Sequence, residues 1–169
     1  MSSEPDPIPR VALGRFGRVL GWVGGAMILA MMTVTTIDVV ARYALGRPLW
    51  GAFEVTEILM GLVIFAGQSL AAAEREHIVV NLLEGRLSPA QRCWQAACGD
   101  LVAAAVAALI AWRVWERGLG LAAVGETTLQ LGVPRGFVAL AMGALMACAA
   151  AVFVLAAIAA ARRAVALRA

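Results

Sequence analysis

The stretch from Thr36 to Glu57, TIDVVARYALGRPLWGAFEVTE, decides how the chain folds. It joins the end of one long apolar segment to the start of the next, and the turn residues Gly46 and Pro48 predict that the chain reverses here. The same stretch carries charged residues, namely Asp38, Arg42, Arg47, Glu54 and Glu57. A charge in hydrocarbon costs roughly 2.5–3.5 kcal/mol at mid-bilayer on insertion scales. We therefore expect these side chains to face protein or water.

The composition is that of an integral membrane protein. Hydrophobic residues make up 62 % of the 169 residues and charged residues 15 %, whereas soluble proteins average about 45–50 % and about 25 %. All fourteen basic residues are arginine and lie at segment ends, which indicates membrane topology rather than nucleic-acid binding despite the net charge of +3. Cys93, Cys98 and Cys148 lack CxxC spacing, so with one histidine they predict no disulfide framework, metal site or other cofactor.

Four apolar segments predict an all-α, four-helix transmembrane bundle over residues 19–161. The predicted spans are 19–41, 53–73, 94–115 and 137–161, each long enough for a ~30 Å hydrocarbon core at 1.5 Å per residue. The first apolar run exceeds the 7–15 residues of a signal-peptide core, so we expect it to be an uncleaved helix. Residues 1–18 are then an N-terminal segment and residues 162–169 a basic tail.

The connections set the expected orientation. Residues 78–87, IVVNLLEGRL, are too short to cross a membrane and suit an amphipathic segment at the interface. Residues 118–136 are rich in glycine and turn residues and predict a long connection. Nine of the fourteen arginines lie on the side that both termini share with residues 74–93. This excess predicts that both termini are cytoplasmic.

Charged residues recur at the predicted outer side of the membrane. Asp38 and Arg42 stand four apart with the acid first, the favourable order for an ion pair on one helix face. The pair either neutralises itself near the outer interface or docks against another subunit. The group expected at this depth contains four acids and four arginines: Asp38, Arg42, Arg47, Glu54, Glu57, Arg113, Glu116 and Arg117. Such a balance predicts a polar clasp rather than a pathway for ions of one sign.

Asp100 lies within the third predicted span. We expect it to find a hydrogen-bond partner at Gln68 or Ser69 or on another chain, the alternative being a proton or ion relay. His77, which follows Glu74 and Glu76, is expected to be solvated or at headgroup level. Glu126 and Pro134 are expected to shape an ordered external turn.

The first predicted span carries Gly21, Gly24 and Gly25, small residues that allow close helix approach. The chain shows neither a nucleophile–base arrangement nor a glycine loop for phosphate, so we expect no enzymatic activity.

Several short motifs, taken in order, carry a resemblance to a known family. They are Asp38–Tyr43 (DVVARY), Pro48, Trp50, Glu54 and Glu57; then Glu76–His77–Ile78 with Val80 and Asn81; then Gly125–Thr128 (GETT) and Leu131–Pro134 (LGVP). Over about residues 10–160 the chain resembles the small membrane subunit, the Q-type or DctQ-like subunit, of tripartite ATP-independent periplasmic (TRAP) transporters. Asn81 stands where the family often has aspartate. Gly51–Ala52 interrupts a commonly tighter Trp–x–Glu–Glu pattern, which leaves open whether Glu54 or Glu57 is the equivalent acid.

The resemblance implies a non-catalytic subunit in the bacterial inner membrane, surrounded by lipid. Its expected partners are a large multi-spanning permease subunit and a periplasmic solute-binding protein that delivers organic acids such as C4-dicarboxylates, with uptake driven by a sodium gradient. Candidate interface or structural residues are Asp38, Arg42, Arg47, Trp50, Glu54, Glu57, His77, Asp100, Arg113, Glu126 and Pro134. One alternative is a stand-alone, proton-coupled four-helix transporter acting as a homodimer through Asp100. Another is a membrane enzyme or redox subunit, which the single histidine disfavours.

Overall fold

The computed structural model describes residues 10–74 and 89–167, which form four helices and no strand. The helices are α1 (Arg10–Ala44), α2 (Ala52–Glu74), α3 (Pro89–Val124) and α4 (Arg135–Ala166). Each contains a stretch long and apolar enough to cross a membrane. The prediction of an all-α, four-helix membrane bundle is therefore confirmed. His77 and the expected interfacial segment lie outside the described residues.

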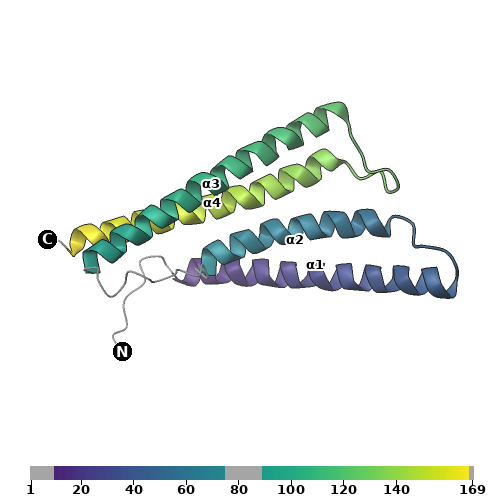
Figure 1. Cartoon of the computed structure of the whole chain (residues 1–169), viewed down its shortest axis with the longest axis horizontal. Helices are drawn as coiled ribbons and strands as arrows, with labels where there is room; N and C mark the ends of the chain where they lie inside the picture. The colour runs from purple at the N-terminus through teal and green to yellow at the C-terminus, as the bar shows by residue number, and fades with distance from the viewer. Residues whose placement is uncertain (1–9, 75–88, 168–169) are drawn as a thin grey trace.

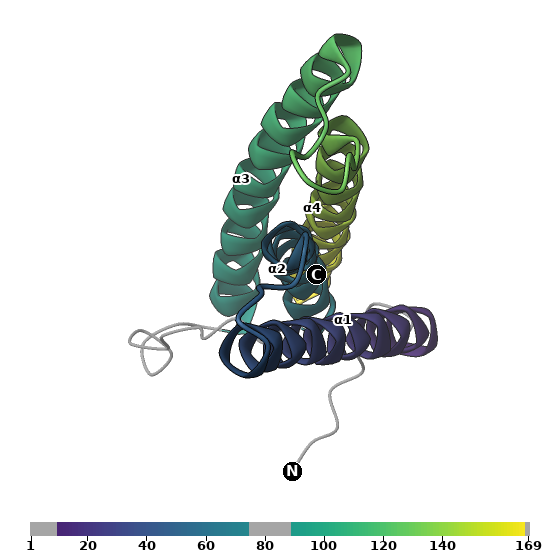
Figure 2. The same cartoon turned by 90° about the vertical axis from the view of Figure 1, so that its right-hand side faces the viewer.

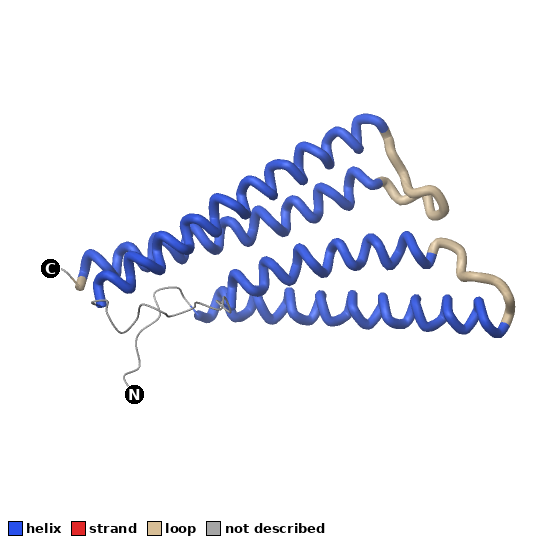
Figure 3. The backbone as a smooth tube through the Cα atoms, viewed as in Figure 1, coloured by secondary structure: helices blue, strands red, loops and turns tan. Residues whose placement is uncertain are grey.

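The helices form two antiparallel hairpins, α1 with α2 and α3 with α4 (Figure 1). Both short connections lie at the same end of the bundle, which we call the loop end (Figure 3). Since α2 packs against α4, the helices follow one another across the molecule in the order α1, α2, α4, α3 (Figure 2). Helix α1 packs mainly on α2, and no residue in the most apolar window of its span is buried.

Small residues at seven-residue spacing form the contact between α3 and α4, which we call the small-residue seam. Its buried members are Ala97, Ala104, Ala111 and Gly118 on α3, and Gly136, Gly143, Ala150, Ala157 and Ala164 on α4. A seven-residue repeat keeps one helix face toward its partner along the whole contact. Lipid tails are as apolar as leucine, so helices in a bilayer associate through van der Waals contact, and small side chains let their backbones approach.

Two glycines of the seam mark the closest approach of the backbones. A Cβ atom on Gly136 would lie 2.6 Å from the Ala122 nitrogen. A Cβ atom on Gly118 would lie 3.1 Å from the Leu140 nitrogen. Because backbone atoms cannot move aside as a flexible side chain can, any larger residue at Gly136 pushes the helices apart.

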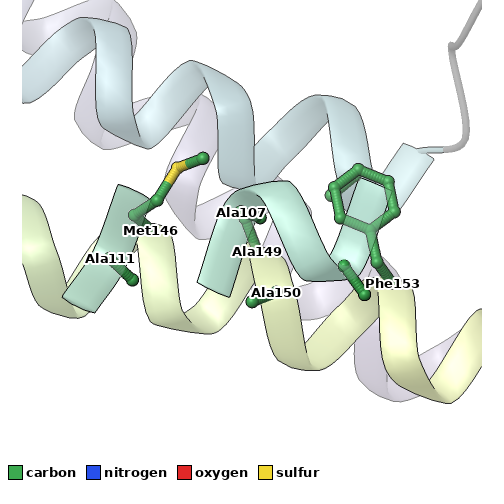
Figure 4. Packing of buried hydrophobic residues seen from close by; sticks show 8 residues of the cluster. Ala107, Ala111, Met146, Ala149, Ala150 and Phe153 are labelled. Atoms are coloured by element: carbon green, nitrogen blue, oxygen red, sulfur yellow. The ribbon is translucent and has the colours of Figure 1, made fainter. Parts of the chain in front are cut away.

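Bulkier side chains fill the contact where α2 joins the seam. Met146 and Phe153 of α4 extend into the core beside the alanines of α3 and α4 (Figure 4). The hydroxyl of Ser69 on α2 is fully buried and donates to the carbonyl oxygens of Leu145, at 2.6 Å, and Phe65, at 3.1 Å. The bond to Leu145 links α2 to α4 and satisfies a polar group that lipid cannot solvate.

The structure corrects one expectation about glycines. Residues 118–136 are not all connection, because α3 continues to Val124 and the connection covers only residues 125–134. The physical reason is that Gly118 and Gly136 serve helix packing rather than a turn. Among the described residues, no atom lies within 4 Å of where a Cβ on Gly21, Gly24 or Gly25 would be, so this surface of α1 is open to a helix of another chain.

Candidate functional site at the loop end

Glu54, in the first turn of α2, is buried and binds the backbone of the distant 125–134 connection. One carboxylate oxygen accepts a hydrogen bond from the backbone N–H of Gln130 at 2.7 Å, and the other accepts one from the backbone N–H of Leu131 at 2.9 Å. Hydrogen bonds to an ionised group are about twice as strong as neutral ones, and the start of a helix favours negative charge. The carboxylate therefore fastens one hairpin to the other.

Gln130 returns two bonds to the start of α2. Its side-chain oxygen accepts the Gly51 amide at 2.7 Å, and its carbonyl oxygen accepts the Trp50 indole N–H at 3.3 Å. We call the resulting group the Glu54 clasp, made of Trp50, Gly51 and Glu54 on one side and Gln130 and Leu131 on the other. The clasp joins segments 76 to 80 residues apart in the chain.

Gly51 is required by both the backbone and the packing of the clasp. Its φ is +74°, in the left-handed region that only glycine occupies freely. A Cβ atom there would also lie 2.6 Å from two carbons of the Leu131 side chain. Gly51 is part of the insertion that lengthens the Trp–x–Glu spacing. Because it has no side chain, it also leaves room for Leu131 to cover the start of α2.

The 125–134 connection is itself ordered by internal bonds. Thr128 exchanges two hydrogen bonds with Val133: its amide donates to the Val133 carbonyl at 2.9 Å, and its hydroxyl accepts the Val133 amide at 3.0 Å. Thr127 and Pro134 form an antiparallel bridge, and Glu126 forms an ion pair with Arg135 at 3.4 Å. These contacts bear out the expected ordered turn at Glu126 and Pro134, with Pro134 directly before the first residue of α4.

Asp38 organises the other connection in the same way. One carboxylate oxygen accepts the Leu49 amide at 2.7 Å, and the other pairs with Arg42 at 2.7 Å. The predicted Asp38–Arg42 ion pair is confirmed, and its acid also caps the turn that leads into α2. Gly46, at φ +66°, provides the reversal expected there.

The remaining charged side chains do not join this site. Glu57 and Arg47 are exposed, and in the described part of the chain Glu57 makes no hydrogen bond or ion pair. Arg113 and Glu116 pair with each other at 3.1 Å on α3, three turns or about 16 Å before that helix ends. The eight charged residues expected at one membrane depth therefore do not form one cluster, and they include two local ion pairs, Asp38–Arg42 and Arg113–Glu116. Of Glu54 and Glu57, Glu54 is the acid that other residues of the chain bind.

Asp100 is half-buried on α3. Of its two expected partners in this chain, Gln68 and Ser69, Ser69 donates its hydroxyl to main-chain carbonyls of α2 and α4. Over residues 10–74 and 89–167, no group of three or more histidine, cysteine, aspartate or glutamate residues could hold a metal ion.

Sequence reasoning did not single out Gln130, although it supplies both bonds back to α2. The only feature of the sequence that marks Gln130 is its position as a polar residue between Leu129 and Leu131. This feature does not indicate that the connection folds back onto the start of α2.

A comparison with protein-family models identifies the family of the chain. The model described as "Tripartite ATP-independent periplasmic transporters, DctQ component" matches residues 31–167. The chain belongs to the DctQ family. No curated protein and no solved structure matches the chain.

The DctQ match extends over both connections and therefore over every residue of the Glu54 clasp. It begins within α1, so the α1 glycines precede it. As a DctQ component the protein is a transmembrane small component of a TRAP transporter and not an enzyme.

Proposed function

We propose that this DctQ component braces a large permease subunit in the bacterial inner membrane. In this proposal the complex takes up organic acids such as C4-dicarboxylates that a periplasmic binding protein delivers, and a sodium gradient drives the uptake. The small subunit itself holds neither the substrate nor the sodium ion. Both termini lie in the cytoplasm, which places the loop end and the Glu54 clasp on the periplasmic side.

The continuity of the helices supports a bracing role. Secondary transporters build their midplane sites from discontinuous helices whose free ends face the substrate. Here each of the four helices runs unbroken, over 35, 23, 36 and 32 residues in turn. Rigid rods of this kind suit support of a neighbouring subunit more than binding of a solute.

The Glu54 clasp is the observation that carries the proposal. Within the bundle, the two hairpins meet mainly where α2 packs on α4. The clasp adds charge-assisted bonds that join α2 to the 125–134 connection at the loop end, while Ser69 joins α2 to α4 within the bundle. Two junctions at different heights keep the hairpins at a fixed angle, as a brace requires.

The open surface of α1 supports a large partner. The most apolar part of its span buries none of its residues in this chain, and its glycines lie open. Open glycines allow another helix to approach closely. A permease subunit packed on α1 would use this surface.

Reconstitution tests the proposal directly. Proteoliposomes containing the large permease subunit of the same transporter are assayed for uptake of a labelled dicarboxylate, with binding protein outside and an inward sodium gradient. We expect uptake only when the small subunit is present, and a lower rate with Glu54→Gln than with the exposed neighbour Glu57→Gln. Uptake by the large subunit alone, or by this chain alone, would contradict the proposed role.

A further inference from the structure

One face of α3 changes from apolar to basic along its length. Val102, Val106, Leu109 and Ile110 are exposed on it, between 38 % and 65 % accessible, and Arg113, Glu116, Arg117 and Gly120 follow. At about 100° per residue these eight positions form one stripe. The stripe points away from the small-residue seam, so α4 does not cover it.

The position of this change along α3 matches the edge of a hydrocarbon core. Between Arg92 and Arg113 the only charged residue is Asp100. The twenty residues from 93 to 112 span about 30 Å, which is the thickness of the core. Arg113 and Arg117 then lie at headgroup level, and Trp94 and Trp112 lie near the two interfaces where tryptophan is enriched.

The charges on this face are not balanced. Arg113 pairs with Glu116, while Arg117 has no ion-pair partner anywhere in residues 10–74 and 89–167. Two arginines four residues apart on one face repel each other. A hollow of about 350 Å³ lies among Arg113, Glu116, Arg117 and Gly120, where the glycine leaves open space. An anion in the hollow would relieve the repulsion.

We propose that this stripe binds one anionic phospholipid, with its phosphate at Arg117 and Arg113 and an acyl chain along Val102 to Ile110. Arginine suits phosphate because its planar fork can donate two hydrogen bonds to it. The apolar lane from 102 to 113 is about 16 Å long at helical rise, close to the length of an acyl chain. The headgroup and the chain thus fit the same face in the order that a bilayer leaflet presents them.

Native mass spectrometry of the full chain in detergent tests the site. The purified protein is titrated with phosphatidylglycerol or with zwitterionic phosphatidylcholine of the same acyl chains, and bound lipid is counted. We expect about a fivefold preference for phosphatidylglycerol, the effect of about one charge. Arg117→Gln should abolish this preference, whereas Glu116→Gln should strengthen it by freeing Arg113 and removing a negative charge.

Arg47→Gln is the matched control, because Arg47 is an exposed arginine at the loop end, outside the stripe. It should leave the preference unchanged. Equal binding of the two lipids, or equal effects of Arg47→Gln and Arg117→Gln, would overturn the proposal. Displacement of the lipid by excess inorganic phosphate would also overturn it, since the acyl lane would then contribute nothing. Crosslinking of Arg117→Cys to a co-purified permease would assign this face to protein instead.

Discussion

The Glu54 clasp and the small-residue seam hold the same bundle together by opposite means. The clasp contains few groups: one carboxylate and one side-chain amide with the backbone amides they bind, at 2.7 to 2.9 Å, and the Trp50 indole on the Gln130 carbonyl, at 3.3 Å. The seam consists of alanine and glycine, whose side chains cannot form hydrogen bonds, and it runs from Ala97 to Gly118 on α3 and from Gly136 to Ala164 on α4. The clasp therefore concentrates its energy in one side chain, whereas the seam distributes it over nine positions.

This difference follows from where each contact lies. Within the bilayer, polar groups find no water, and close backbone packing is the available source of attraction. At the loop end, backbone amides of a connection must be satisfied outside a helix, and a carboxylate can satisfy two at once. One substitution should therefore remove the clasp, while the seam should be sensitive only where the backbones nearly touch.

Removal of the Glu54 carboxylate should have the largest effect. Glu54→Ala leaves the amides of Gln130 and Leu131 without their acceptor, and we expect a loss of about 3 kcal/mol from the free energy of unfolding. The measurement is unfolding of the purified chain by added SDS, followed by circular dichroism. Hydrogen exchange should show faster exchange at Gln130 and Leu131 but not along the seam.

Glu57→Ala is the control for this experiment, because Glu57 lies one turn further along α2 and is exposed. It should change stability by less than about 0.5 kcal/mol. Equal losses from the two alanine variants would mean that the clasp contributes no stability of its own.

Widening the seam at its tightest point should have the next largest effect. In Gly136→Ala the new Cβ meets the backbone of Ala122, so the helices must separate, at an expected cost of about 2 kcal/mol. Gly99→Ala is the matched control, since nothing lies near its Cβ position and alanine is the better helix former. The control should stabilise the protein slightly. A loss with Gly99→Ala as large as with Gly136→Ala would remove the distinction between tight and open positions.

The sequence predicted the helices better than the contacts between them. Length and apolarity are enough to identify four spanning segments, because a bilayer leaves the backbone few alternatives. Gly118 and Gly136 led to the prediction of a connection, because glycine occurs both in turns and in tight helix contacts. To tell a turn glycine from a packing glycine, one must know which helix lies opposite. In the sequence, only the seven-residue spacing of small residues could have indicated the helix contact.

The site was predictable in part, for a related reason. The Asp38–Arg42 pair follows from spacing on one helix and could be predicted. Glu54 and Glu57 both lie near the start of α2, so local sequence cannot distinguish them. Only the fold of the 125–134 connection shows which acid is covered, and its position depends on Gly51 and Gln130 acting across the bundle.

A smaller change should weaken the clasp without removing its charge. Gly51→Ala forces a side chain into a left-handed conformation, and displaces Leu131 from the start of α2. We expect a loss of about 1.5 kcal/mol, most of it from the backbone. Because the Leu131 side chain can move, the double variant Gly51→Ala with Leu131→Ala should recover little of that loss. Full recovery would show that the clash, and not the backbone conformation, makes glycine necessary.

The smallest effect should separate the two bonds of Asp38. Arg42 is more than half exposed, so its ion pair lies where water and headgroups screen charge, and Arg42→Gln should cost only about 0.5 kcal/mol. Asp38→Ala also removes the acceptor of the Leu49 amide and should cost about 1 kcal/mol more. Asp38→Asn keeps an oxygen for that amide, so it should resemble Arg42→Gln when the variants are unfolded side by side. If Asp38→Asn instead matches Asp38→Ala, the ion pair and not the turn cap is the main contribution of Asp38. The parallel with Glu54, in which a carboxylate acts chiefly as a backbone acceptor, would then not extend to the first connection.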